Sequence, residues 1–371
     1  MQLNNKKFYY SFCALLLLYN FSYAQSIPIL QVDFNPRSYI CYFTDENMNI
    51  DGKLDEISWQ KVDWSENFVD IEGDVKPKPR FRTKVKMLWD NNYFYIAAEL
   101  EEPHIWATLK NRDDIIFYDN DFEVFIDPDG DTHKYIEFEM NAFNTVWDLL
   151  LIKPYRDIDK AALHGYDIKN LKSGVKIYGT INYPDDIDSC WTVEIAFPWE
   201  AFKEITSVKI PPSDGNQWRI NFSRVEWKTS VKNNHYEKII NPETNKPYPE
   251  DNWVWSPQGV VNMHYPEMWG YVQFTVMKAG CGKVDFISSD LEKIKWYLRN
   301  IYYLQKSYFE KNKKYARNIS VLGIKPLKMN GRIYKPEIET ISDFFKCSIS
   351  TFDKFDVAIY SDGLIFITNK K

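Results

Sequence analysis

Short segments in which polar and apolar residues alternate follow one another through most of this chain, and turn residues separate them. Residues 83–89 and 93–100 flank an Asp-Asn-Asn turn, and residues 121–127 and 134–141 flank a Pro-Asp-Gly turn. Alternation with a period of two is typical of a half-buried strand, and a tight turn between two such segments predicts a hairpin. Further strands are expected at 145–149, 175–181, 191–197, 217–227 and 271–276.

This strand pattern predicts an antiparallel β-sandwich. A parallel sheet needs crossover helices between its strands, and helical periodicity is almost absent from the central part of the sequence. Many short strands with turns between them indicate two packed antiparallel sheets. Phe, Trp and Tyr make up 17% of the chain. Because flat rings pack well on a pleated surface, we expect most of them in the core and some as platforms for sugar rings.

The sequence changes character near residue 280. In residues 291–313 apolar side chains recur every three or four positions, which predicts an amphipathic helix. Two strands are expected near 357–360 and 364–368, with a Ser-Asp-Gly turn between them. We therefore divide the chain into a signal peptide at 1–24, a lead-in segment at 25–48, the sandwich at 49–278 and a small α+β unit at 279–371.

The first residues predict export to the periplasm, the cell surface or the medium. Lys6 and Lys7 precede an apolar stretch at 8–18, and Ser22 and Ala24 place small residues before a cleavage point, as in a secretory signal peptide. A membrane anchor is the alternative, although the apolar stretch is short for a bilayer. No other segment has the roughly 18 consecutive apolar residues of a membrane span, so we expect no transmembrane segment in the mature chain.

The net charge and the cysteine content limit which partners and which disulfides we expect. The net charge of −6 argues against a nucleic-acid partner, which would require a basic face. Cys41, Cys190, Cys281 and Cys347 follow the predicted signal peptide. In an exported chain they form up to two disulfides, for example Cys281 with Cys347, or they remain buried free thiols.

Seven segments, taken in order over about 230 residues, resemble carbohydrate-binding module family 9. They are IDGKLDE at 50–56 with Trp59, VKMLWDNNYFYI at 85–96, DFEVFID at 121–127, WTVEIAFPW at 191–199, RINFSR at 219–224, WVWSP at 253–257 and WGYVQF at 269–274. The resemblance implies a non-catalytic β-sandwich that grips the end of a glycan chain. Two aromatic rings clamp the terminal sugar in that family, carboxylate and amide side chains bond its hydroxyls, and structural calcium is common.

The resemblance also places a sugar site on this sequence. The sugar-bonding carboxylate falls on Glu123, the sugar-bonding Asn on Asn141, and a family Gln on Arg224. Glu139 stands where the family has an Arg. The first clamp ring falls on Phe117 or Tyr118, and the second falls in residues 262–265, which contain His264 but no Trp. We expect a ring-lined hollow in which Glu123 and Arg224 converge.

Three further residues are candidates from their position on strands. Glu226 lies two residues after Arg224, so the two side chains share one face and offer a donor beside an acceptor, or form a surface ion pair. Trp253 and Trp255 also share one face, either as a stacking platform or as part of the core.

The turn after residues 121–127 predicts a cation site. Asp127, Asp129 and Asp131 are spaced two residues apart, and carboxylate oxygens at this spacing suit calcium. A plain acidic turn is the alternative.

Carbohydrate binding in support of polysaccharide breakdown or uptake is therefore the first functional hypothesis, with an oligo- or polysaccharide and glycan-processing enzymes as partners. A structural or interaction protein that has lost the sugar site is the second. A glycoside hydrolase, which requires two carboxylates about 5–10 Å apart, is the third. We expect no catalysis, because the GxSxG, HExxH and Gly-rich phosphate motifs are all absent from the sequence.

Overall fold

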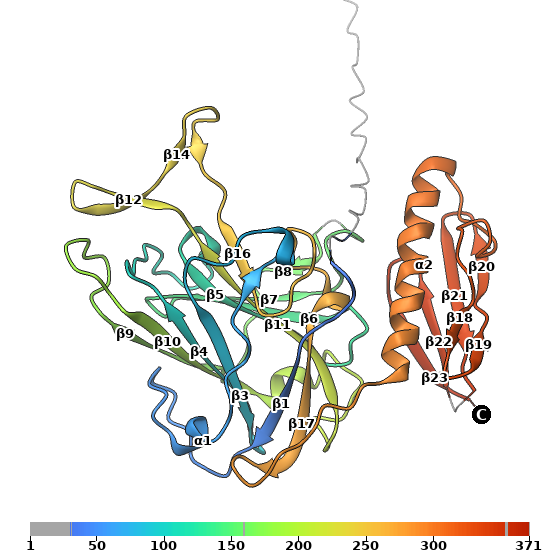
Figure 1. The fold of residues 1–371 in the computed structure, drawn as a ribbon, viewed down its shortest axis with the longest axis horizontal. Helices are drawn as coiled ribbons and strands as arrows, with labels where there is room; N and C mark the ends of the chain where they lie inside the picture. The colour runs from blue at the N-terminus through green and yellow to red at the C-terminus, as the bar shows by residue number, and fades with distance from the viewer. Residues whose placement is uncertain (1–29, 31, 159, 353–354, 371) are drawn as a thin grey trace, which may run out of the picture.

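The computed structural model describes residues 30, 32–158, 160–352 and 355–370 and is mainly β (Figure 1). A large sandwich is followed by a smaller unit of one long helix and a sheet. The predicted signal peptide at 1–24 lies outside the described residues. No helix in the described part of the chain is long and apolar enough to cross a membrane.

One continuous path of paired strands forms the sandwich. Its order is β8 (Ala162–Leu163), β7 (Val146–Leu151), β6 (Tyr135–Asn141), β5 (Asp121–Asp127), β11 (Gln217–Glu226), β17 (Gly270–Lys278), β1 (Ser38–Phe43), β3 (Thr83–Trp89), β4 (Tyr93–Glu101), β10 (Cys190–Pro198) and β9 (Lys172–Tyr178). β16 (Asp251–Val254) pairs with β11 and with β2 (Val69–Asp70). Buried side chains from both halves of the path pack into one core, which confirms the predicted sandwich.

β1 corrects two expectations. It lies within the segment predicted as a lead-in, yet it occupies the middle of the strand path. It also pairs in parallel with β17 and with β3, so the sandwich is antiparallel everywhere along this path except at β1. Both partners are distant in sequence, and a local pattern carries no information about such pairing.

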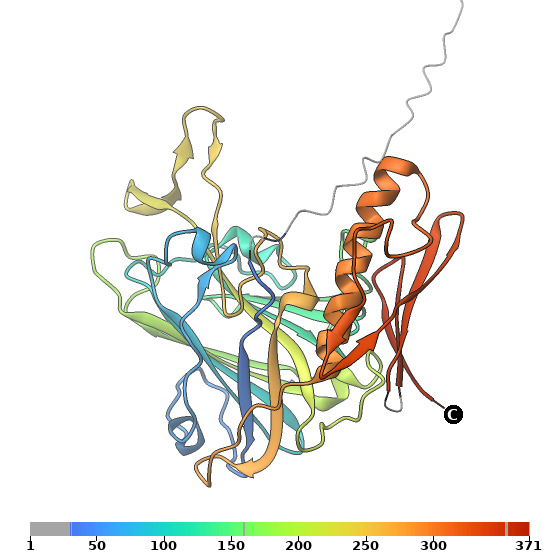
Figure 2. The ribbon, with the colours of Figure 1, turned by 45° about the vertical axis from the view of Figure 1, so that its right-hand side comes forward.

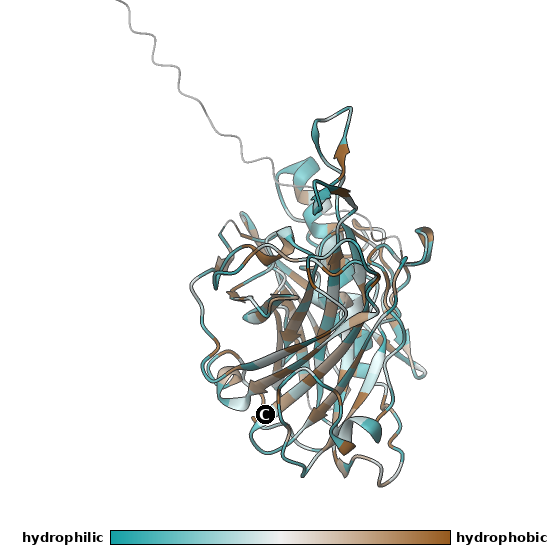
Figure 3. Cartoon of the chain, turned by 90° about the vertical axis from the view of Figure 1, so that its left-hand side faces the viewer, coloured by the Kyte–Doolittle hydropathy of each residue, from teal (hydrophilic) through white to brown (hydrophobic). Residues whose placement is uncertain are grey.

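The alternation along β5 and its neighbours decides which side chains are available for binding. Phe122, Val124 and Ile126 belong to the core between the two halves. The intervening side chains of β5 therefore point to the outer face of the same layer. Polar and apolar positions are interspersed along the sandwich strands (Figure 3). The outer face of the layer formed by β7, β6, β5 and β11 carries the candidate site.

Small elements and loops complete the sandwich. They include α1 (Ile57–Gln60) and four 3-10 turns, namely η1 (Gly73–Val75), η2 (Ile116–Tyr118), η3 (Trp199–Phe202) and η4 (Pro266–Met268). Two hairpins project from the end of the sandwich (Figure 1). They are formed by β12 (Thr229–Lys232) with β13 (His235–Lys238), and by β14 (Ile240–Asn241) with β15 (Lys246–Pro247).

Glu194 holds the segment that contains the Asp-Gly motif against the sheet. Its carboxylate accepts bonds from the backbone N–H groups of Asp51 (3.0 Å) and Gly52 (2.9 Å) and from the indole of Trp59 (2.8 Å). A Cβ atom on Gly174 would lie 2.7 Å from the carbonyl carbon of Asp51, so this position admits only glycine without a backbone shift.

We expect Gly174→Ala to lower the free energy of unfolding by about 1–3 kcal/mol, because the added methyl group meets backbone rather than a movable side chain. Gly165→Ala is the matched control, since a Cβ atom there has no neighbour within 4 Å. Urea unfolding of both variants measures the difference. Equal stability of the two variants would show that the contact is not as tight as described.

The C-terminal unit is a helix packed on a sheet (Figure 2). α2 (Asp290–Asn312) confirms the predicted helix and packs on the sheet of β20 (Glu337–Ile341), β21 (Phe344–Ser350), β22 (Phe355–Tyr360) and β23 (Ile365–Asn369). A further hairpin is formed by β18 (Leu327–Met329) and β19 (Arg332–Tyr334). The two last strands were predicted, whereas β18 to β21 were not.

The four cysteines that follow the predicted signal peptide are free thiols. Cys41 and Cys347 are buried, Cys190 is half-buried and Cys281 is exposed. Of the two alternatives, the structure therefore shows free thiols rather than disulfides.

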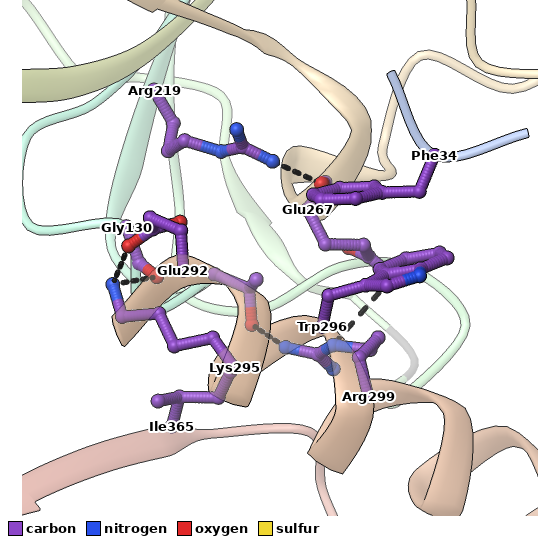
Figure 4. Close-up of a pocket in the computed structure, with 10 residues that line it drawn as sticks. Phe34, Gly130, Arg219, Glu267, Glu292, Lys295, Trp296, Arg299 and Ile365 are labelled. Atoms are coloured by element: carbon purple, nitrogen blue, oxygen red, sulfur yellow. Dashed lines mark hydrogen bonds and ion pairs between the residues drawn. The ribbon is translucent and has the colours of Figure 1, made fainter. Parts of the chain in front are cut away.

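Buried charges join the C-terminal unit to the sandwich. Glu267 on η4 forms an ion pair of 2.9 Å with Arg156 and lies 3.8 Å from Arg299 of α2, and it accepts a hydrogen bond from the hydroxyl of Tyr303. Figure 4 shows the same junction, where Trp296 of α2 stacks on Phe34 with ring centroids 4.1 Å apart. These contacts fix the helix to the sandwich.

Candidate functional site

Four carboxyl groups gather on the outer face of β5 and β6. Asp121 and Glu123 lie on β5, and Glu137 and Glu139 on β6. Glu123 is paired directly across the ladder with Glu139, and Phe125 with Glu137, which places all these side chains on one face. We call Asp121, Glu123, Glu137 and Glu139 the acidic face. Each of the four is at most 6% exposed.

Burial dominates the electrostatics of the acidic face. It raises the pKa of Glu123 to about 7. Burial, followed by repulsion from the charge of Glu123, also raises the pKa values of Asp121, Glu137 and Glu139 well above their usual range. Carboxyl groups held this way either share protons or require positive charge from a ligand.

Few bonds from the protein reach these carboxyl groups. The backbone N–H of Phe117 donates to Glu139 (3.1 Å), and the backbone N–H of Val225 donates to Asp121 (3.2 Å). The second oxygen of Asp121 is buried without a hydrogen-bond partner, as is the hydroxyl of Ser223, which lies across the ladder from Glu123. The acidic face therefore retains hydrogen-bonding capacity for a ligand.

Aromatic rings border the acidic face at both ends. At the Glu139 end lie Phe117 and Tyr118 of η2, whose ring centroids are 4.9 Å apart. At the Glu137 end, Tyr155 packs edge-on against His264 at 4.5 Å, and the charges of Glu137 and Glu139 reach the hydroxyl of Tyr155. Tyr118 is 52% and Tyr155 41% exposed, so both rings are accessible to a ligand.

Trp147 adds another ring beside the acidic face. It is paired across the ladder with Glu139, and its ring stacks on His164 at 5.7 Å with 15° between the planes. Trp147 is buried and His164 is exposed, so the imidazole covers the indole.

His264 lies at the border of the acidic face and is also held by a hydrogen bond with Tyr135. Its Nδ1 lies 2.9 Å from the hydroxyl of Tyr135. Burial, with the positive charge of Arg156, lowers its pKa to about 3, so the imidazole is neutral in any ordinary buffer. His264 therefore contributes an uncharged ring.

Arg224 lies on the other face of the sheet, and the expected convergence with Glu123 is wrong. Glu123 is paired with Ser223, so the next side chain of β11 points into the sandwich. There the guanidinium of Arg224 donates to Glu102 (2.8 Å) and Glu226 (2.8 Å). The expectation for Glu226 is therefore also wrong, both as a sugar ligand and as part of a surface ion pair, because the pair is buried.

Asn141 reaches the correct face but is already fully bonded. Its amide nitrogen donates to the carbonyl of Leu109 (2.9 Å) and to Asp119 (3.0 Å), and its oxygen accepts from the backbone of Phe143 and Thr145. It is completely buried. Its role in this structure is to hold the loops around η2, not to present a free amide.

Trp253 and Trp255 belong to the core, so the stacking-platform alternative is wrong. They are 3% and 0% exposed and pack with the other rings of the sandwich interior. Trp253 also receives the guanidinium of Arg224, 5.3 Å from its ring centroid. No part of either ring is available to a sugar.

Asp127, Asp129 and Asp131 do converge at the predicted turn, where one oxygen from each lies within 4.8 Å of the others. Both oxygens of Asp127 accept backbone N–H bonds from its own turn, and the hydroxyl of Thr206 donates to Asp129 (2.7 Å). The ammonium of Lys295 lies 3.3 Å from the carbonyl oxygen of Gly130. The donor set fits calcium, but Lys295 already brings positive charge to this turn, and calcium here stays a prediction.

The sequence interpretation missed Glu137, Trp147, Tyr155 and Ser223. Glu137 and Glu139 alternate with apolar residues of β6, and Glu123 does the same on β5. This alternation was the sequence signal that could have indicated an acidic face. Tyr155 lies in a loop, and nothing in its local sequence distinguishes it from other exposed tyrosines.

The family model described as "Carbohydrate family 9 binding domain-like" matches residues 50–273. An exoglucanase, XynX, of Acetivibrio thermocellus is 29% identical over 100 residues, which are 27% of this chain and 8% of that protein. The chain thus spans only a small part of the curated relative that it matches.

Solved structures with a similar course of the chain include a putative carbohydrate-binding protein from Bacteroides uniformis. It has a TM-score of 0.47 at 14% identity and covers 65% of this chain and 100% of its own. A family 9 module of Caldicellulosiruptor kristjanssonii in complex with cellotriose has a TM-score of 0.41 at 17% identity, covering 68% of this chain and 100% of its own.

Proposed function

Because this chain belongs to the carbohydrate family 9 binding domain-like family, we propose that its sandwich binds the end of a glycan chain at the acidic face and does not cleave it. The observation that carries the proposal is the placement of accessible rings at both ends of a row of carboxyl groups. Tyr118 and Tyr155 stack on sugar rings, and Glu123 and Glu137 accept bonds from sugar hydroxyls.

The setting of the site supports binding without hydrolysis. Hydrolysis by two carboxyl groups requires a proton donor and an ionised partner whose pKa values are pushed apart. On the acidic face burial raises the pKa values of all four carboxyl groups, so all four shift in the same direction rather than apart. Release of reducing sugar from bound oligosaccharides would contradict this part of the proposal.

The biological role that follows is export and the capture of polysaccharide for breakdown or uptake, beside glycan-processing enzymes. The signal-peptide pattern at 1–24 and the family support it. Detection of the mature chain in the periplasm, at the cell surface or in the medium tests the location.

We expect Tyr118→Ala and Tyr155→Ala each to weaken oligosaccharide binding about five- to tenfold, since each removes a stacking contact of about 1 kcal/mol. A glycan array with the full chain identifies the ligand, and calorimetry then measures its affinity. Tyr178→Ala is the matched control, because Tyr178 is 44% exposed and lies on β9, at the end of the strand path opposite β7 and β6. Unchanged affinity in both site variants would remove the acidic face as the binding site.

A further inference from the structure

Three of the four carboxyl groups of the acidic face come together closely enough to share one ion. Asp121, Glu123 and Glu139 each place one oxygen within 4.8 Å of the others. Two oxygens on opposite sides of a calcium ion are about 4.6–5.2 Å apart, because each lies 2.3–2.6 Å from the ion. The three carboxyl oxygens are therefore close enough together to contact one ion of this size.

An unpartnered hydroxyl points at the same place. Ser223 is completely buried, and its Oγ has no hydrogen-bond partner. Its hydroxyl is close enough to Glu123 to lower the pKa of that carboxyl, yet it makes no bond of acceptable geometry. One oxygen of Asp121 is also unpartnered and buried. Buried polar atoms without partners are rare, and two at one carboxylate cluster indicate a missing electrophilic partner.

Among the described residues, no ion pair includes Asp121, Glu123 or Glu139. Arg224 of β11 and Lys238 of β13 are engaged elsewhere: Arg224 bonds Glu102 and Glu226 in the interior, and Lys238 lies over the ring of Trp227, 3.3 Å from its centroid. Three buried carboxylates without a cation are costly.

We propose that the acidic face holds a divalent, oxygen-preferring cation such as Ca²⁺, bound by Asp121, Glu123 and Glu139 with the Ser223 hydroxyl as a fourth ligand. The ion neutralises the carboxylates and partners the two orphaned oxygens. This site is separate from the Asp127 turn, where Lys295 is present. It shares Glu123 with the proposed glycan site, but the observations that support it do not involve a sugar.

The test is a calcium titration of the full chain after removal of metals with EDTA, followed by calorimetry and thermal melting. The wild type should bind Ca²⁺ and melt at a higher temperature in Ca²⁺ than in EDTA. Glu139→Gln and Asp121→Asn should each weaken this binding at least tenfold. Glu200→Gln is the matched control, because its carboxylate is exposed and belongs to neither acidic group, and it should leave the binding unchanged. Asp129→Asn reports separately on any calcium bound at the Asp127 turn.

The difference in melting temperature between Glu139→Gln and the wild type should change sign when calcium is added. This change separates a cation site from a purely structural role of these carboxyl groups. In EDTA, Glu139→Gln should melt at a higher temperature than the wild type, because it removes a repelling charge. In Ca²⁺ the order should reverse, because the variant has lost a ligand. Absence of calcium binding by the wild type, or binding that only Asp129→Asn removes, would overturn the proposal.

The outcome remains distinguishable from a failure of the proposed glycan binding. Oligosaccharide affinity is read from Tyr118→Ala and Tyr155→Ala, which leave the three carboxyl groups in place. Calcium affinity is read without sugar. Calcium binding that survives the loss of sugar binding supports the cation site alone.

Discussion

Replacing Arg224 by methionine should lower the free energy of unfolding by about 3–5 kcal/mol, because it leaves Glu102 buried without its cation and Glu226 with only the half-exposed Arg80, 3.7 Å away. Arg224 is completely buried and bonds Glu102, Glu226 and the carbonyl of Glu101 inside the sandwich. Urea unfolding followed by tryptophan fluorescence measures the loss.

Arg82→Met is the matched control for Arg224→Met. Arg82 pairs with Glu99 at 3.4 Å but is 50% exposed, so its removal should cost less than about 1 kcal/mol. Because Arg224 faces away from Glu123, the folded fraction of the Arg224 variant should retain the sugar affinity of the wild type. A stable variant that has lost sugar binding would return Arg224 to the site.

Replacing Glu267 by leucine should detach the C-terminal unit from the sandwich. Arg299 would then remain buried without an acidic partner among the described residues, and Arg156 would keep only Asp157, 3.5 Å away, which costs about 3–5 kcal/mol. We expect faster proteolysis in the connection between β17 and α2, at residues 279–289, measured by mass spectrometry of the fragments. Glu339→Gln is the control, because its ion pair with Lys346 is exposed. Equal cleavage in both variants would contradict the role of Glu267.

Acid should produce the same detachment. Although burial opposes ionisation, the charges of Arg156 and Arg299 prevail and lower the pKa of Glu267 from 4.5 to about 2. The resulting stability is present above the unfolded pKa of 4.5 and is lost as the pH falls from 4.5 towards 2. The change is on the order of 3 kcal/mol, since each pKa unit corresponds to about 1.4 kcal/mol. A flat stability profile over this range would contradict the assignment.

Local patterns predicted the strands well where alternation and turns were both strong. The hairpin of β3 and β4 and the strand β5 were placed to within one residue. β1 was missed because its stability comes from parallel pairing with β17 and β3, which are far away in the sequence. Long-range pairing of this kind leaves no signal in a short segment.

Some residues of the candidate site were expected from the sequence, and the main error in their placement has a simple physical cause. Side chains of a strand alternate between faces, so a shift of one residue moves a side chain through the sheet. Alignment placed Arg224 in the cleft, whereas Ser223 is the residue opposite Glu123. Glu123, Phe117, Tyr118 and His264 do lie on or beside the outer face, while Tyr155 was missed because loops carry no periodicity.

Oxidative footprinting of tyrosines, with and without the oligosaccharide identified on the array, tests the location of the glycan site most directly. If sugars stack at the two ends of the acidic face, Tyr118 and Tyr155 will both be protected by the ligand, whereas Tyr178 of β9, which is similarly exposed, will not. Protection of Tyr178 with Tyr118 and Tyr155 still oxidised would place the ligand elsewhere and contradict the account.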